Sequence, residues 1–272
     1  MNFHQKLQRI WQQNNSLVCV GLDPDLEKLP RHLGTDNKAI LAFNKAIIDA
    51  TADLVCAYKP QIAYYSAVGA EAELEQSISH IKNHYSHIPV ILDAKRGDIG
   101  ATAKQYAKEA FERYQADALT VNPYMGFDTL EPYFEYNNKG VIVLCHTSNP
   151  GAKQLQELRL SQSGLRLFEY VASEARKLFD QGAQISLVLG ATLAEELKTV
   201  RAIVGDMPLL VPGLGAQGGD LQATIKNGLG KTNPALILNN SRALIYADSS
   251  VNFAQCCRQA CTDMRDKIRE SM

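Results

Sequence analysis

The stretch VILDAKRGDIG, residues 90–100, changes character halfway along its length. It begins as an apolar run typical of a buried strand, and it then places Asp93, Lys95 and Asp98 within six positions. Alternation along a strand predicts that Asp93 and Lys95 share one face. We expect Asp98 to fall in the first turn of the following helix. Opposite charges at the end of an apolar strand suggest a fold in which the ends of several strands lie close together.

Short apolar runs like this one recur along the whole chain. They are LVCVGLD (17–23), LVCAYKP (54–60), PVILDAK (89–95), ALTVNPY (118–124), GVIVLCHT (140–147), ISLVLGA (185–191), PLLVPGL (208–214) and ALILNNS (235–241). Continuous rather than alternating apolar character is typical of parallel strands covered on both faces. Segments with helical spacing lie between them, as at 37–54, 163–179 and 252–268.

Eight strands that alternate with helices predict a (β/α)₈ TIM barrel. We expect an extra N-terminal helix at about residues 2–13 and a single domain over residues 1–272. A doubly wound open sheet is the alternative, but eight regular units favour closure.

Composition narrows the class of protein. The net charge is −1 and the charged fraction is 21%, with no clustered basic excess that would indicate nucleic-acid binding. No apolar run reaches the ~18 residues of a membrane span, and residues 1–15 lack the apolar centre of a signal peptide. We therefore expect a cytoplasmic protein that binds neither nucleic acid nor membrane. The six cysteines are expected to be reduced thiols, and their spacing predicts no metal site.

Polar groups stand where the predicted strands end, which in a TIM barrel is the rim that carries the chemistry. They are Asp23, Lys59, Asp93, Lys95, residues 146–149, the GLGAQGGD of 213–220, and residues 239–242. A lysine among carboxylates stays protonated, so these lysines suit a proton donor better than an amine nucleophile. The glycine-rich turn and Arg242 follow the seventh and eighth strands, where barrels often bind phosphate.

Several of these pieces together resemble the orotidine 5'-phosphate decarboxylase family, in its longer bacterial subgroup. The matching pieces are Asp23, KPQ at 59–61, DAKRGDIGAT at 93–102, TSNPG at 147–151, VPGLGAQGGD at 211–220, and Arg242. The stretch NNSRALIYA departs from the more usual wording before the arginine. The resemblance implies conversion of orotidine 5'-monophosphate to UMP and carbon dioxide, with no metal or organic cofactor.

The resemblance also implies roles for the charged residues. Lys95 would protonate C6 of the pyrimidine as carbon dioxide leaves, and Asp93 would lie beside the substrate carboxylate. Lys59 would hold the charged groups in line and touch the ribose. Asp98 and Thr102 would reach into the partner's site in a homodimer with shared active sites.

The remaining substrate contacts follow from the same resemblance. Asp23 would bind a ribose hydroxyl, and Ser148 would contact the pyrimidine. Gln217 and Arg242 would hold the phosphate.

Two other functions stay open at this point. A related barrel group shares D-x-K-x-x-D but uses magnesium on a sugar phosphate. That group has a glutamate ligand where this chain has Lys59, which speaks against the metal. A catalytically silent barrel that binds nucleotides is the second alternative, but it should have lost members of the charged set, and all are present.

Overall fold

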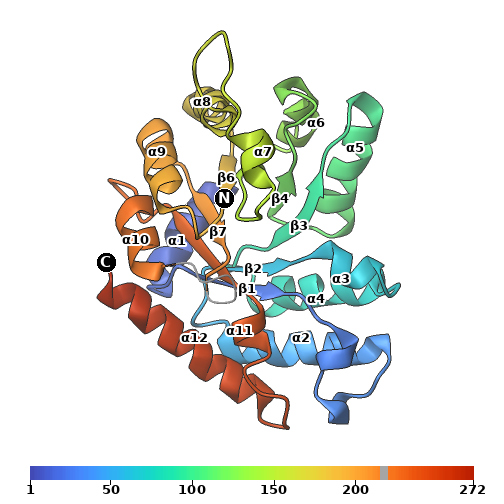
Figure 1. Cartoon of the computed structure of the whole chain (residues 1–272). Coiled ribbons are helices and arrows are strands. Elements are labelled where there is room, and N and C mark those ends of the chain that lie inside the picture. The colour runs from blue at the N-terminus through green and yellow to red at the C-terminus, as the bar shows by residue number, and fades with distance from the viewer. Residues whose placement is uncertain (215–219) are drawn as a thin grey trace.

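The computed structural model describes residues 1–214 and 220–272, and within them it contains one parallel sheet of eight strands. The strands are β1 Val18–Leu22, β2 Ala57–Pro60, β3 Ile91–Arg96, β4 Ala118–Val121, β5 Gly140–His146, β6 Ile185–Leu189, β7 Leu209–Pro212 and β8 Leu236–Asn240. Their order is β2-β1-β8-β7-β6-β5-β4-β3. Single bridges at Tyr58–Val90 and Gln61–Asp93 join the two ends, so the sheet forms a nearly closed barrel (Figure 1).

Helices surround the strands in Figure 1. They are α1 Phe3–Gln13, α2 Asn37–Thr51, α3 Ile62–Ser66, α4 Glu71–His84, α5 Gly100–Lys108, α6 Glu131–Phe134, α7 Ala152–Gln156, α8 Leu167–Asp180, α9 Ala194–Val204, α10 Leu221–Gly228, α11 Arg242–Ile245 and α12 Phe253–Glu270. Shorter turns of helix are η1 Leu26–Lys28, η2 Arg31–Leu33, η3 Glu109–Arg113 and η4 Phe127–Leu130. In the described part of the chain, no helix combines the length and apolar character that crossing a bilayer would require.

The predicted TIM barrel with an extra N-terminal helix is confirmed. Each of the eight apolar runs coincides with one strand. Six strands end one to three residues inside the predicted bounds, β2 ends at the predicted residue, and β3 extends one residue beyond it to Arg96. Every residue of β1 and β6 is buried, as continuous apolar runs between two layers should be.

The N-terminal helix α1 packs its apolar stripe against the barrel. Phe3, Leu7 and Ile10 are buried, three to four residues apart. The ring of Phe3 lies directly against Gly140 at the start of β5, where a Cβ atom would clash with the ring. Because Gly140 opens a strand, α1 sits at the end of the barrel opposite the rim that the polar residues occupy.

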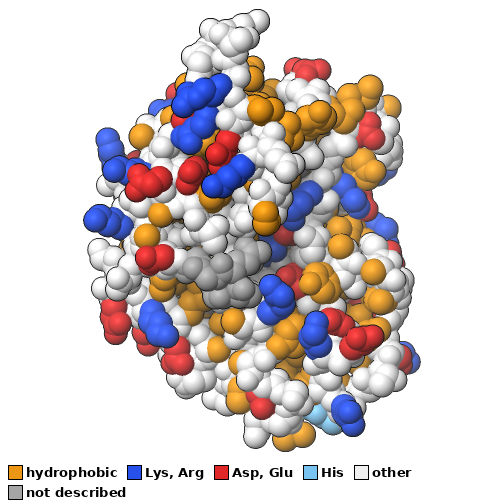
Figure 2. Space-filling view, in the orientation of Figure 1, with side chains coloured by type: hydrophobic (Ala, Val, Ile, Leu, Met, Phe, Trp, Pro, Cys, Tyr) orange, Lys and Arg blue, Asp and Glu red, His pale blue; other side chains and the backbone are white. Residues whose placement is uncertain are grey.

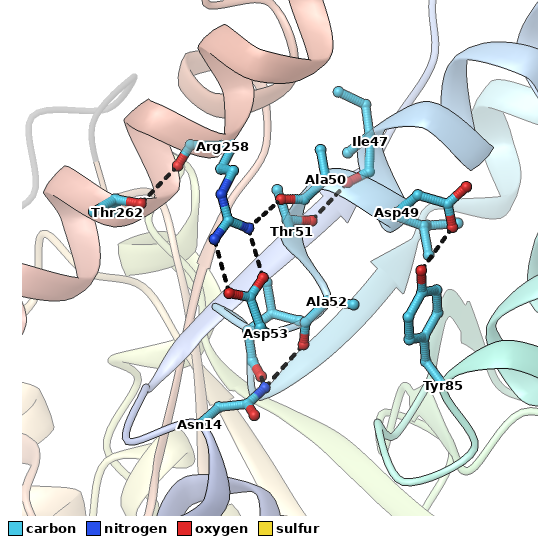
Figure 3. A network of polar contacts seen from close by, with 12 residues as sticks. Asn14, Ile47, Asp49, Ala50, Thr51, Ala52, Asp53, Tyr85, Arg258 and Thr262 are labelled. Atoms are coloured by element: carbon cyan, nitrogen blue, oxygen red, sulfur yellow. Dashed lines mark hydrogen bonds and ion pairs between the residues drawn. The ribbon is translucent and has the colours of Figure 1, made fainter.

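Polar contacts tie the C-terminal helix to the connection between α2 and β2 (Figure 3). Both Nη atoms of Arg258 in α12 donate to the Asp53 carboxylate, at 2.6 and 2.8 Å, and Nη1 also donates to the Ala50 carbonyl. Asn14, just after α1, donates to the carbonyls of Ala52 and Val55. Helices from the two ends of the sequence are thereby fixed to the same turn.

Candidate active site

Asp93 lies at the centre of a charged cluster at the C-terminal end of the barrel. Basic and acidic side chains lie near one another around the middle of the face seen in Figure 2. Its Oδ2 atom is 2.7 Å from Nζ of Lys59, and its Oδ1 atom is 2.7 Å from Nζ of Lys95. Asp93 and Lys59 are 7% and 4% exposed, whereas the Lys95 side chain is 45% exposed. One buried carboxylate thus holds a buried and an accessible ammonium group, and the accessible one can meet a ligand.

The charges in this cluster stabilise one another. Burial alone raises the pKa of Asp93, but Lys59 and Lys95 outweigh it and hold that pKa well below its usual range. Burial alone lowers the pKa of Lys59, and Asp93 together with Asp23 reverses the effect and raises it. Asp93 is therefore ionised and Lys59 protonated at neutral pH.

Thr120 on β4 completes the cluster, and sequence reasoning did not select it. It is 1% exposed, and its hydroxyl donates to Asp93 Oδ1 at 2.9 Å. The backbone N–H groups of Ala94 and Lys95 both donate to the same Oγ1 atom, each at 3.0 Å. A lone threonine in an apolar run carries no signal of this role, because the contact depends on how β4 lies beside β3.

The ladder between β3 and β4 is irregular at this point. Ile91 and Leu92 pair with Ala118 and Leu119, and the next pair is Arg96 with Val121. Lys95 has a positive φ of 48°, a conformation that a lysine rarely adopts. Alternation correctly predicted that Asp93 and Lys95 meet, although the strand is not regular where they do.

Asp23 follows β1 and stands beside this cluster. Gly21 of β1 pairs with Lys59 of β2, which brings the ends of the two strands together. Asp23 Oδ1 is buried without a hydrogen-bond partner among the described residues. Buried polar atoms are normally satisfied, so this oxygen is suited to accept a hydrogen bond from a ligand. Gly21 itself packs against Ser241, where a Cβ atom would come within 2.7 Å of the Ser241 Cβ.

Ser148 lies beyond β5, against the end of β6. A Cβ atom on Gly190 would come within 2.9 Å of the Ser148 backbone nitrogen, so the glycine permits this close approach. His146, in contrast, is fully buried, with its ring edge-on to Phe168 and 3.3 Å from Glu157. Of the polar residues that end β5, His146 therefore serves packing and does not reach the open rim.

The predicted phosphate ligands are only partly described. Arg242 is the first residue of α11, directly after β8, and it is exposed and makes no ion pair with any described residue. Gln217 lies outside the described residues. The carboxylate of Asp220 caps α10 by accepting from Ala223 N, so one of the N–H groups at that helix end is already used.

Asp98 and Thr102 stand apart from the cluster in their own chain. The expectation that Asp98 lies in the first turn of the next helix is wrong, because α5 begins at Gly100 with Ile99 as its N-cap. The Asp98 carboxylate instead accepts from Ile99 N at 2.8 Å in the preceding turn, where it makes no ion pair with a described residue. Thr102 is exposed on α5. Neither side chain is among the polar contacts of Asp93.

Comparison with known proteins agrees with the fold. Residues 16–255 match the model of the orotidine 5'-phosphate decarboxylase / HUMPS family. Two relatives named orotidine 5'-phosphate decarboxylase are 53% and 56% identical, from Janthinobacterium sp. and Dechloromonas aromatica, and each alignment covers 98% of both chains. The structure of OMP decarboxylase from Leishmania donovani superposes with a TM-score of 0.86 at 36% identity, covering 100% of this chain and 99% of that one. Over nearly its whole length, this chain belongs to the orotidine 5'-phosphate decarboxylase / HUMPS family.

Proposed function

We propose that this enzyme converts orotidine 5'-monophosphate to UMP and carbon dioxide, with Lys95 as the proton donor and without a metal or organic cofactor. The observation that carries the proposal is the buried Asp93 carboxylate held between Lys59 and Lys95, each at 2.7 Å. Relatives of this chain at 53–56% identity bear the name of that activity.

The cluster can account for every bond, electron pair and proton of the reaction. The bond between C6 and the carboxylate carbon breaks, carbon dioxide leaves, and the bonding electron pair stays on C6. The accessible Lys95 ammonium stabilises that negative charge and transfers one proton to C6. Asp93 is ionised, so it disfavours the nearby substrate carboxylate and favours the state in which that charge has moved away. Lys59 keeps Asp93 in place.

Groups around the cluster suit the rest of the nucleotide. The unpaired Asp23 Oδ1 would accept a hydrogen bond from a ribose hydroxyl. Ser148, held against Gly190, would contact the pyrimidine. Arg242, with Gln217 as a second ligand, would bind the phosphate, and binding energy there would help to orient C6 over Lys95.

A magnesium-dependent reaction on a sugar phosphate fits the charges less well. The ammonium of Lys59 lies 2.7 Å from Asp93 Oδ2, and the ammonium of Lys95 lies equally near Oδ1. A divalent cation on Asp93 would have to replace both of these favourable contacts.

The function is tested by an ultraviolet assay of orotidine 5'-monophosphate loss, with and without EDTA. We expect rapid loss of substrate, UMP as the product, and the same rate after EDTA treatment. Turnover that EDTA abolishes and Mg²⁺ restores would support the metal-dependent alternative. Binding of nucleotides without turnover would support a silent barrel.

Arg242→Ala is expected to weaken binding of the nucleotide through its phosphate. Losing a charge-assisted contact typically costs ~1.5–3 kcal/mol, which is about 10- to 150-fold in KM. The fold should be retained, because the Arg242 side chain is exposed.

The matched measurement for Arg242→Ala uses orotidine, which lacks the phosphate. The variant should handle orotidine as well as the wild type does. Equal damage to turnover of both substrates would show that Arg242 is not the phosphate ligand.

The active unit is proposed to be a homodimer with shared sites. Asp98 and Thr102 do not contact their own chain's Asp93 cluster, although they directly follow Lys95 at the same rim. The segments that follow β3 and β4 also carry exposed apolar side chains, namely Ile99, Tyr124 and Met125. A second chain that covers these side chains would also bring its Asp98 and Thr102 to this site.

A further inference from the structure

The hydroxyl of Thr120 uses every hydrogen bond that it can make. A hydroxyl has one proton and two lone pairs. The backbone N–H groups of Ala94 and Lys95 occupy the lone pairs, each at 3.0 Å, so the proton is directed to Asp93 Oδ1 at 2.9 Å. Because Thr120 is 1% exposed, water cannot replace these contacts.

This hydroxyl stands where the β3–β4 ladder is interrupted. Between the pairs Leu92–Leu119 and Arg96–Val121, residues 93–95 of β3 face the single residue Thr120 of β4. Bulges are common next to active sites, where they turn a side chain in a new direction. In this bulge Lys95 has a φ of 48°, which a non-glycine residue keeps only when its surroundings fix it.

We infer that Thr120 is a positioning residue that holds the bulge and thereby aims the Lys95 ammonium. The Thr120 side chain binds two backbone N–H groups of the bulge, and it binds the same Asp93 oxygen that pairs with Lys95. Thr120 thus holds the backbone of Lys95 and the carboxylate of Asp93 at the same time. It acts through that pair and makes no contact with the reacting carbon itself. The expected effect on kcat rests on the proposed function. The expected effect on the conformation of Lys95 rests on geometry alone.

Thr120→Val tests the inference, because valine has nearly the same shape and lacks the hydroxyl. We expect kcat for orotidine 5'-monophosphate to fall about 10- to 100-fold, as for a catalytic group displaced by about 1 Å. KM should change little, because the proposed phosphate and ribose contacts, Arg242 and Asp23, follow other strands. Thr120→Ser keeps the hydroxyl and should restore kcat to near the wild-type value.

Thr51→Val is the matched control. Thr51 is also fully buried, and its hydroxyl donates to the Ile47 carbonyl at 2.7 Å and contacts the Tyr58 hydroxyl at 2.9 Å. It ends α2, at the far end of β2 from the charged cluster. This variant should lose stability and keep kcat. If Thr120→Val is insoluble, Thr120→Ala removes the same hydroxyl, and the same fall in kcat is expected.

Kinetic and structural outcomes would each overturn the inference. The kinetic ones are a kcat for Thr120→Val equal to that of the wild type, and a Thr120→Ser variant as slow as Thr120→Val. The structural one is a crystal structure of Thr120→Val in which Lys95 keeps both its positive φ and its contact with Asp93 Oδ1. The crystal structure also separates the two proposals. If the wild type did not decarboxylate orotidine 5'-monophosphate, the proposed function would fail while the structure would still decide what Thr120 holds.

Discussion

Lys95→Ala is expected to fold, to bind UMP and to lose nearly all turnover of orotidine 5'-monophosphate. Help from a general acid is typically worth ~10²–10⁴-fold, and loss of the charge that stabilises C6 should add to this. The fold should persist because the Lys95 side chain is 45% exposed and because Asp93 keeps Lys59 and Thr120 as partners. Steady-state kinetics and UMP titration measure the two effects separately.

Lys177→Ala provides the control for a lost lysine charge. Lys177 is exposed on α8 and pairs with Glu174 at 2.7 Å, in the same chain but away from the cluster. This variant should match the wild type in kcat and KM. If Lys95→Ala kept turnover within about tenfold of the wild type, the smallest gain expected of a general acid would be missing, and Lys95 could not be the proton donor.

Mixing inactive Asp98→Ala and Lys95→Ala chains should restore activity. In a heterodimer with shared sites, one site receives both defects and the other receives neither. Each heterodimer should therefore show up to about half of the activity of a wild-type dimer. The geometry motivates this result, because Asp98 bonds Ile99 N in its own chain and does not pair with Lys95 there. Turnover is measured after subunit exchange, with native mass spectrometry to count heterodimers.

A second mixture serves as the negative control. Lys59 and Lys95 bind the same Asp93 carboxylate, so both belong to the site of their own chain. A heterodimer of Lys59→Met and Lys95→Ala chains therefore has one defect in each of its two sites. That mixture should stay inactive. The shared-site proposal is wrong if heterodimers of Asp98→Ala and Lys95→Ala form and show no turnover.

The sequence by itself determined the order and type of the main elements. Strands covered on both faces must be apolar throughout, so eight such runs were visible without tertiary information. The same logic located most of the site, because parallel strands deliver their C-terminal ends to one rim. Asp23, Lys59, Asp93 and Lys95 could be named in this way, and Lys59 and Lys95 do meet at Asp93. Their positions at the strand ends did not indicate their catalytic and binding roles, which only the resemblance to a known family implied.

Only the tertiary structure decided which residues hold this cluster in place. Thr120 became visible through the register of β4 beside β3, and register depends on packing between distant segments rather than on local spacing. The positive φ of Lys95 occurs within the irregular stretch of β3, where strand alternation does not predict the backbone conformation. The start of α5 at Gly100 leaves Asp98 before the helix in whose first turn it was expected. His146 is buried edge-on against Phe168 of α8, a contact between a strand and a helix distant in sequence. The residue pattern of a strand predicts which side chains share a face. The pairing with the neighbouring strand determines where those side chains lie relative to the site.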